Sequence, residues 1–298
     1  MTILDSESLF RPEAECNEDG ARLRALVQSR LTAHDLTRFN ECGFLVIQNV
    51  ISPEHVNRLQ RMIFQSCGAD PNDETTWYVH KGGRNGSVGV YHHQSQWDAR
   101  QCPAIYQSFA EVLDHSALWV SIDRAKLQMP VRTALDARST DNFIHWDIDL
   151  RVLPERRLVQ GVLCLSHATA NHGGFQCVPG FHRKVPHMSE RERGNPWAAA
   201  ARFGQGDIHV VEANAGDLIV WDSLLPHGAG YNYSQEPRAA QFIRMFPAAG
   251  DNLGLVETRI RYWSDQLPAQ HCAVPVASEG PARLTSLGRK LLGLCEVR

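Results

Sequence analysis

The sequence lacks long apolar runs. No stretch approaches the roughly 20 apolar residues that a membrane-spanning helix needs. The opening segment, MTILDSESLFRPEAECNEDG, is acidic and has neither the basic nor the apolar region of a signal peptide. We therefore expect no membrane partner, and we expect residues 1–30 to form a mobile, polar N-terminal segment.

The chain also lacks a basic stripe and a paired-cysteine motif. Its 30 Lys and Arg residues stand against 33 Asp and Glu residues, and both signs are spread along the chain to give a formal net charge of -3. Nucleic-acid binding requires concentrated positive charge, so no nucleic-acid partner is expected. The eight cysteines are scattered without a CxxC pair, which predicts reduced thiols and a cytoplasmic location.

Capping signals predict two helices early in the chain. Thr32 and Asp35 can form a capping box, and Gly43 can end the helix that they begin. Ser52 stands before a proline, which is typical of a second helix start, and that helix is expected to end near Gly68. Between the two helices, residues 44–50 form a short apolar run of strand type.

Short strand-like runs dominate the rest of the chain. After a helix near residues 104–117, Gly, Pro and Asn separate six apolar runs, at residues 143–150, 158–165, 175–178, 208–211, 218–221 and 239–246. This pattern predicts a sandwich or jelly roll. Residues 76–100 show no helical period and are expected to form a long functional loop. Residues 282–294 are expected to form a C-terminal helix.

The segment NFIHWDID at residues 142–149 carries a candidate metal motif. On a strand, His145 and Asp147 would project from one face and Trp146 from the other. His227, at the end of a later apolar run, can supply a third ligand. Two histidines and one carboxylate on one face leave three positions open, as in non-haem Fe(II) oxygenases. Taken alone, an HxD pair is common by chance, and His227 could equally be a turn histidine.

Arg238 strengthens the metal interpretation. It follows His227 after a polar Tyr-Asn-Tyr-Ser-Gln-Glu-Pro turn, so a hairpin would bring Arg238 back beside His227. A guanidinium is planar and permanently charged, and it can bind a carboxylate with two parallel hydrogen bonds. A dicarboxylate could then bind the metal at one end and Arg238 at the other. The alternative is an ordinary surface arginine at the start of a strand.

These motifs together resemble the phytanoyl-CoA dioxygenase family of 2-oxoglutarate oxygenases, over nearly the whole chain after residue 30. The matching segments are LTAHDLTRFNECGFLVI (31–47), HWD (145–147), NHGGFQCVPGFH (171–182), HGAGYNYS with the later Arg238 (227–238) and LTSLGRKLLG (284–293). The family often has a serine where this chain has Ala229, so Arg238 is expected to hold the cosubstrate with less help.

The resemblance implies a mainly β fold with flanking helices and a double-stranded β-helix (jelly roll, cupin-like) core. It places that core at about residues 120–247 of a single oxygenase domain, residues 31–298. It implies Fe(II), with 2-oxoglutarate and O2 as cosubstrates and ascorbate as a stimulant. The implied catalytic metal ligands are His145, Asp147 and His227, and Arg238 and Gln128 are placed at 2-oxoglutarate.

The implied reaction is oxidation of a small molecule, with decarboxylation of 2-oxoglutarate to succinate and CO2. Related halogenases replace the ligand carboxylate with a small residue, so Asp147 favours hydroxylation over halogenation. Two alternatives stay open: a cupin-like isomerase or lyase that uses no 2-oxoglutarate, and a catalytically silent binding module. Arg238 argues against the isomerase or lyase, because such a protein needs no residue to hold a cosubstrate. The three intact ligands argue against the silent module, because each is costly to keep buried without a metal.

Several further residues are weaker candidates. Gln160 could face the cavity or be a satisfied core glutamine. His182 is expected to be structural. Four residues of the long loop could line a substrate pocket or an exposed surface: Tyr91, His92, His93 and Trp97. Six arginines near the first metal motif would suit an anionic substrate if some of them faced inward: Arg124, Arg132, Arg138, Arg151, Arg156 and Arg157.

Overall fold

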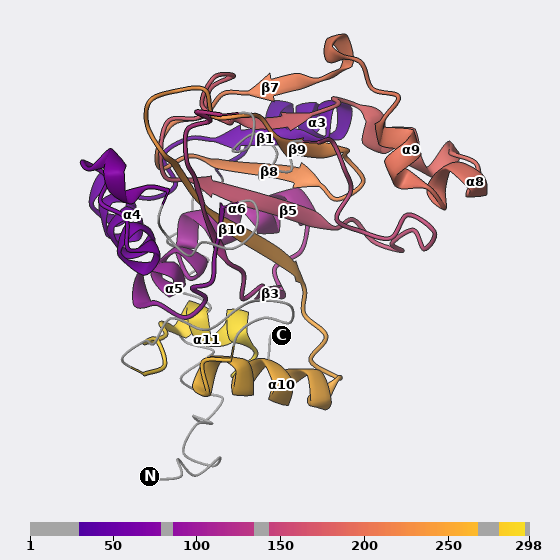
Figure 1. Ribbon diagram of the computed structural model, residues 1–298. Helices are drawn as coiled ribbons and strands as arrows, with labels where there is room; N and C mark the ends of the chain where they lie inside the picture. The colour runs from indigo at the N-terminus through magenta and orange to yellow at the C-terminus, as the bar shows by residue number, and fades with distance from the viewer. Residues whose placement is uncertain (1–29, 79–85, 134–142, 268–279, 296–298) are drawn as a thin grey trace.

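Two antiparallel sheets form the centre of the protein in this computed structural model, which describes residues 30–78, 86–133, 143–267 and 280–295 (Figure 1). The large sheet has the strand order β1-β8-β5-β10-β4-β2, and β3 also pairs with β10. Its strands are β1 (Phe44–Ile47), β2 (Ser87–Val88), β3 (Leu118–Val120), β4 (Ala125–Gln128), β5 (Val159–Cys164), β8 (Leu218–Asp222) and β10 (Arg238–Pro247). The small sheet has the order β7-β6-β9, from β6 (Phe175–Cys177), β7 (His209–Val211) and β9 (His227–Ala229).

Helices flank the sheets, as predicted. They are α3 (Ala33–Cys42), α4 (Pro53–Cys67), α5 (Gln94–Arg100), α6 (Pro103–Leu113), α8 (Glu190–Arg193), α9 (Pro196–Ala200), α10 (Leu253–Ser264) and α11 (Ser286–Leu292). Thr32 and Asp35 form the predicted capping box, and Gly43 ends α3 with φ 86°, a left-handed conformation that suits glycine. No helix among the described residues combines the length and the apolar character needed to cross a bilayer.

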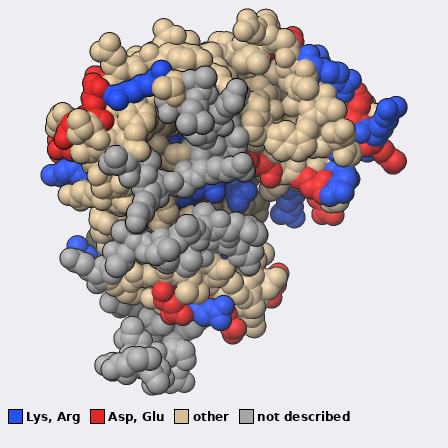
Figure 2. All heavy atoms as spheres, in the orientation of Figure 1, with Lys and Arg blue, Asp and Glu red and all other residues tan. Residues whose placement is uncertain are grey.

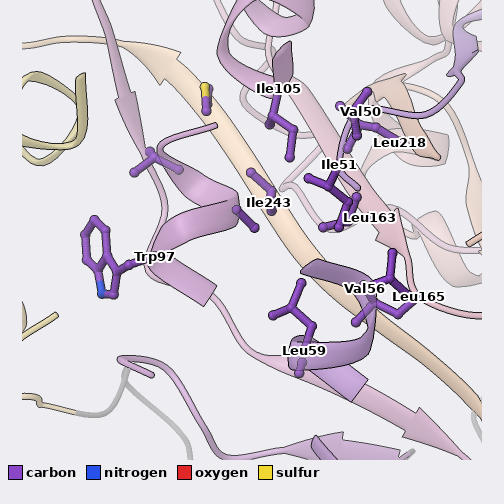
Figure 3. Packing of buried hydrophobic residues seen from close by; sticks show 14 of the residues in the cluster. Val50, Ile51, Val56, Leu59, Trp97, Ile105, Leu163, Leu165, Leu218 and Ile243 are labelled. Atoms are coloured by element: carbon purple, nitrogen blue, oxygen red, sulfur yellow. The ribbon is translucent and has the colours of Figure 1, made fainter. Parts of the chain in front are cut away.

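The two faces of the large sheet pack against different partners. One face carries Leu163 and Leu218, which lie in a cluster with side chains from the covering helices α4, α5 and α6 (Figures 1 and 3). The opposite face carries Val162 and Ile219, which pack against Phe175 of the small sheet. Strand residues alternate between the faces, so β1, β5, β8 and β10 each contribute to both clusters. The space between the two sheets is where the candidate site lies.

Some local predictions were wrong. Residues 143–150 form no strand: His145 makes a single bridge to His227, and the chain then bends. The backbone N–H of Arg151 donates to the Asp149 carboxylate, a local hydrogen bond that competes with strand pairing. The expected loop at residues 76–100 contains β2 and α5, and the sequence pattern missed α10 entirely.

Two further predictions concern the chain ends and the cysteines. The N-terminal segment expected to be mobile lies almost entirely outside the described residues. The prediction of reduced thiols is wrong for Cys295, which forms a disulfide. Five cysteines among the described residues are free thiols, as predicted: Cys42, Cys67, Cys102, Cys164 and Cys177. A thiol pattern without CxxC gave no sign of this bond.

Candidate metal centre

Backbone pairing fixes the two histidines beside each other. His145 and His227 exchange two hydrogen bonds, with N–O distances of 2.8 Å and 2.9 Å. The close approach depends on Gly228, because a Cβ there would lie 2.5 Å from the carbonyl oxygen of Phe143. Trp146 points the other way: its indole N–H donates to the Leu224 carbonyl at 2.8 Å. The predicted separation of His145 and Trp146 onto opposite sides therefore holds without a regular strand.

Asp147 completes a three-residue cluster. One carboxylate oxygen lies 3.3 Å from Nε2 of His145, and the other lies 3.2 Å from Nε2 of His227. The potential ligand atoms of these residues all lie within 4.8 Å of one another, so the cluster could hold a metal ion. Two ligands about 2.1 Å from one octahedral ion lie about 3 Å apart when they are neighbours. The nitrogen–oxygen distances therefore fit ligands to one shared ion.

The other ring nitrogen of each histidine is held by the backbone. Nδ1 of His145 lies 3.1 Å from the Phe143 carbonyl oxygen, and Nδ1 of His227 lies 2.9 Å from that of Leu225. A carbonyl can only accept, so each Nδ1 carries a proton, and Nε2 of each ring is the nitrogen that faces Asp147 and would bind a metal. This arrangement orients both rings for metal binding.

The charge at Asp147 is stabilised by the same histidines. Burial alone would raise the pKa of Asp147, but hydrogen bonds from His145 and His227 outweigh it and hold that pKa well below its ordinary value. At His145, burial opposes the charged form, yet the Asp147 carboxylate and the Phe143 carbonyl raise the pKa of the ring. Asp147 is thus a carboxylate at neutral pH, which is the form that binds metal.

Arg238 lies in the same pocket as the three residues, but the predicted hairpin was wrong. His227 begins β9 of the small sheet, whereas Arg238 begins β10 of the large sheet, and the two strands do not pair. The connection between them crosses from one sheet to the other, so the pocket between the sheets brings the two residues together. Both line one cavity of about 370 Å³ together with His145 and Asp147.

Arg238 is a buried cation without a carboxylate partner among the described residues. Only 4% of it is exposed, and burial lowers the pKa of its guanidinium. Its Nη1 donates to the side-chain oxygen of Gln128 at 3.4 Å, a long bond to a neutral group. The neighbouring Cys164 supplies no negative charge, because burial raises the pKa of its thiol to about 11. Gln128 is anchored in turn by donating to the Gly230 carbonyl at 2.9 Å.

Other sequence candidates fall elsewhere. Trp97 is in the hydrophobic core, and His92 hydrogen-bonds to the Leu267 carbonyl, so neither lines the cavity. Nε2 of His182 donates to the Asn40 carbonyl, and the ring lies against Gly43, which agrees with a structural role. Tyr91 is buried and His93 caps α5, and neither is a cavity residue.

Of the six arginines near the first metal motif, Arg124 lines the cavity. Arg132, Arg151 and Arg157 pair with carboxylates of Glu74, Asp149 and Asp222, Arg156 is exposed away from the cavity, and Arg138 lies outside the described residues.

Sequence reasoning assigned no site role to several residues that line the cavity. Among them are Lys126 of β4, Trp221 of β8, and Phe242 and Arg244 of β10. Gln160, a weak candidate from the sequence, also lines it. The signal was available in the alternation of the strands: Arg244 has the same parity as Arg238, so both face inward once one of them does.

Comparison with known proteins places the chain in a family. The model of the phytanoyl-CoA dioxygenase (PhyH) family matches residues 39–240. The chain belongs to the phytanoyl-CoA dioxygenase family. The matched region contains the three-residue cluster and ends two residues beyond Arg238. The family predicted from the motifs is therefore confirmed.

Individual proteins also resemble the chain in sequence or in fold. The chain is 27% identical over 263 residues to a putative phytanoyl-CoA dioxygenase of Dictyostelium discoideum, covering 72% of this chain and 75% of the relative. It is 25% identical to the Ava biosynthesis cluster protein O of Aspergillus versicolor, covering 78% and 83%. The crystal structure of EvdO2 from Micromonospora carbonacea var. aurantiaca with 2-oxoglutarate matches with a TM-score of 0.51 at 21% identity, covering 75% of this chain and 95% of that one. This last likeness is one of fold.

Proposed function

We propose that this family member is an Fe(II)- and 2-oxoglutarate-dependent oxygenase that hydroxylates or otherwise oxidises a small molecule. In this proposal the two sheets are the halves of a double-stranded β-helix within a single domain of residues 31–298, located in the cytoplasm. Family membership supports the class of reaction, and the 2-oxoglutarate in EvdO2 supports the cosubstrate.

The observation that carries the proposal is Arg238. A buried guanidinium without a counter-ion is costly, because burial penalises charge that no partner offsets. A ligand carboxylate would supply that partner and restore the missing hydrogen bonds. Arg238 shares a cavity with the cluster of His145, Asp147 and His227, so one bound dicarboxylate can reach both. A cupin-like isomerase or lyase without a cosubstrate leaves Arg238 unexplained.

The residues present fit the implied metal and cosubstrate. His145, Asp147 and His227 would hold Fe(II), and Arg238, steadied by Gln128, would hold the far carboxylate of 2-oxoglutarate. When bound, this pair would supply O2 activation: O2 is the oxidant, one of its oxygen atoms ends in succinate as 2-oxoglutarate loses CO2, and the other oxidises the substrate. The chain orients both histidines through the Phe143 and Leu225 carbonyls and lines the pocket with aromatic rings that limit water, among them Phe175 and Phe242.

The carboxylate of Asp147 bears on the type of oxidation. It lies between both histidines and occupies the position that a halide would need. Hydroxylation is therefore proposed over halogenation. A mass-spectrometric screen of metabolite pools supplied with iron, ascorbate and 2-oxoglutarate should show a product heavier by one oxygen or lighter by two hydrogens, and no chlorinated product.

Titration with 2-oxoglutarate tests the proposed function directly. Under anaerobic conditions, wild-type protein with Fe(II) should bind 2-oxoglutarate and develop the metal-to-ligand absorption band. Arg238→Gln should weaken this binding about 30-fold or more while iron binding stays nearly intact, because removing one partner of a desolvated charge pair costs about 2–5 kcal/mol. Lysine at this position should restore only part of the affinity, since it offers a point charge instead of a fork.

Arg156→Gln is the matched control for charge. Arg156 is exposed and lies outside the cavity, so its loss should leave 2-oxoglutarate affinity unchanged. If the wild-type protein does not bind 2-oxoglutarate, the proposed function is wrong. A cupin-like isomerase or lyase, or a catalytically silent binding module, would then be the better interpretation. Equal affinity in wild type and Arg238→Gln would remove Arg238 from the cosubstrate site.

A further inference from the structure

The cavity has a second polar region away from Arg238. Trp221, Gln160 and Arg244 are direct neighbours on β8, β5 and β10, because Gln160 pairs with Trp221 on one side and with Arg244 on the other. Cross-strand partners face the same side of a sheet, and all three line the cavity. Arg244 stands six residues along β10 from Arg238, which separates the two by about 20 Å of strand.

Two buried N–H groups in this row have no partner among the described residues. Gln160 is 7% exposed and Trp221 is 2% exposed, and neither the amide Nε2 of Gln160 nor the indole Nε1 of Trp221 makes a hydrogen bond. Buried donors are nearly always satisfied, so two adjacent exceptions on a cavity wall point to a ligand that accepts from them.

The row lies close to the metal cluster. The ring of Trp221 has its centroid 4.9 Å from that of His227. A group that accepts from Trp221 and Gln160 is therefore held near the metal, and the Arg244 side of the row extends away from it.

Positive charge gathers at the Arg244 side. Arg124 also lines the cavity there, and the backbone N–H of Phe242 donates to the Arg124 carbonyl, which places Arg124 beside β10. Both arginines are exposed, and neither has an ion-pair partner among the residues that the structure describes. The carboxylate of Asp123 lies nearby, but it also interacts with the buried cation Arg100. Basic side chains, in blue, are visible near the middle of the face in Figure 2.

We propose that this row is the substrate subsite and that it takes an organic acid. The acid group binds Arg244 and Arg124, the apolar part lies against Phe242 and Val162, and an oxygen acceptor near the oxidised carbon receives the N–H groups of Gln160 and Trp221. The inference rests on the proposed function for the identity of the reaction, and it adds the chemical class of the substrate. Gln160 and Arg244 are specificity-determining residues in this scheme.

The test compares acids with uncharged partners of the same shape. The probes are 3-phenylpropionate with 3-phenylpropanamide, and hexanoate with hexanamide. Their affinities are measured by calorimetry on protein loaded anaerobically with Fe(II) and saturating 2-oxoglutarate, so that Arg238 is already engaged. In at least one pair the acid should bind about 10-fold more tightly than the amide, as expected for hydrogen bonds to a charged group.

Variants of the cavity arginines test which residues make the acid bind more tightly than the amide. Arg244→Gln, with or without Arg124→Gln, should bring the acid to the affinity of the amide while 2-oxoglutarate affinity stays within a factor of about two of wild type. Arg156→Gln removes the same charge from outside the cavity and should keep the full ratio. Gln160→Leu should leave hexanoate affinity nearly unchanged but weaken 5-oxohexanoate, because only the second acid carries an oxygen acceptor besides its acid group.

Three results would overturn the inference: acids and amides that bind equally or not at all in wild type, a ratio that survives in the Arg124, Arg244 double variant, or a Gln160→Leu change that acts on 2-oxoglutarate affinity alone. Failure of the proposed function looks different, because it is a loss of 2-oxoglutarate binding. In the Arg238→Gln background, where that cosubstrate binds weakly, the acid-to-amide ratio and its dependence on Arg244 can still be measured.

Discussion

The two faces of strand β5 carry different kinds of side chain. Toward the helices, Leu163 is fully buried among apolar residues of α4 and α6. Toward the small sheet, Gln160 is also buried but leaves a hydrogen-bonding group without a partner. The first face contributes stability, because apolar burial there leaves nothing unsatisfied. The second face is less stabilising, because it buries a polar group without a hydrogen-bond partner in the cavity wall. A ligand that supplies the missing hydrogen bond would restore that stability.

Removing a metal ligand should have the largest effect. It should lower turnover without lowering the stability of the fold. His145→Ala, Asp147→Ala and His227→Ala should each lower iron-dependent turnover by more than the roughly 10–100-fold seen for residues that only support a ligand. The melting temperature of the metal-free protein should change little. Succinate release and thermal unfolding, measured on the same preparations, check this. Near wild-type turnover in any of the three would remove that residue from the ligand set.

Shortening a side chain on the helix-covered face should give the reverse result. Leu163→Ala should reduce the free energy of unfolding by about 2–5 kcal/mol, through lost burial and the cavity left behind. The 2-oxoglutarate affinity of the folded fraction should stay as in wild type. Denaturant titration and anaerobic 2-oxoglutarate titration measure the two quantities.

Gln160→Leu is the paired control on the same strand. It replaces a buried amide that has an unsatisfied end with an apolar group of similar size, so stability should hold or rise. A loss of stability as large as that of Leu163→Ala would mean that the two faces do not differ in this way.

The smallest expected effect concerns Ala229, which lines the cavity where the family often has a serine. Ala229→Ser adds a hydroxyl that can hydrogen-bond to the cosubstrate, so 2-oxoglutarate affinity should rise roughly 2–10-fold, the value of one ordinary hydrogen bond. Unfolding free energy should stay within about 0.5 kcal/mol of wild type. The same absorption titration detects the change, and a weaker affinity would show that the residue crowds the site instead.

The sequence was most informative where local chemistry alone decides the structure. The capping box of Thr32 and Asp35 and the glycine at residue 43 depend on neighbours within one helix, and the structure has them as predicted. His145 and Asp147 do lie beside each other as predicted, although the strand alternation assumed for them is absent. Five of the six strand-like runs after residue 140 became strands, because each combines apolar alternation with turn residues on both sides.

The sequence was least informative where partners lie far apart in the chain. The hairpin prediction assumed that β9 and β10 pair because they are consecutive, but they belong to different sheets. No pattern within these two segments predicts which sheet each strand joins. The same holds for Arg244, whose role depends on Gln160 lying opposite it across 84 residues of chain. Helix α10 has no strong apolar stripe and none of its residues is fully buried, which explains why its pattern was missed.

His145, Asp147 and His227 differ in exposure, and this bears on how the proposed iron would enter the site. The side chain of Asp147 is 47% exposed, against 28% for His145 and 6% for His227. Asp147 also lies in a bent segment, just past the single backbone bridge at His145. An incoming ion would meet Asp147 first and reach His227 last, and it would leave in the reverse order. If iron binds here as proposed, its exchange with the medium would depend on the carboxylate, so chelators should remove it faster from a variant that weakens the Asp147 ligand than from wild type.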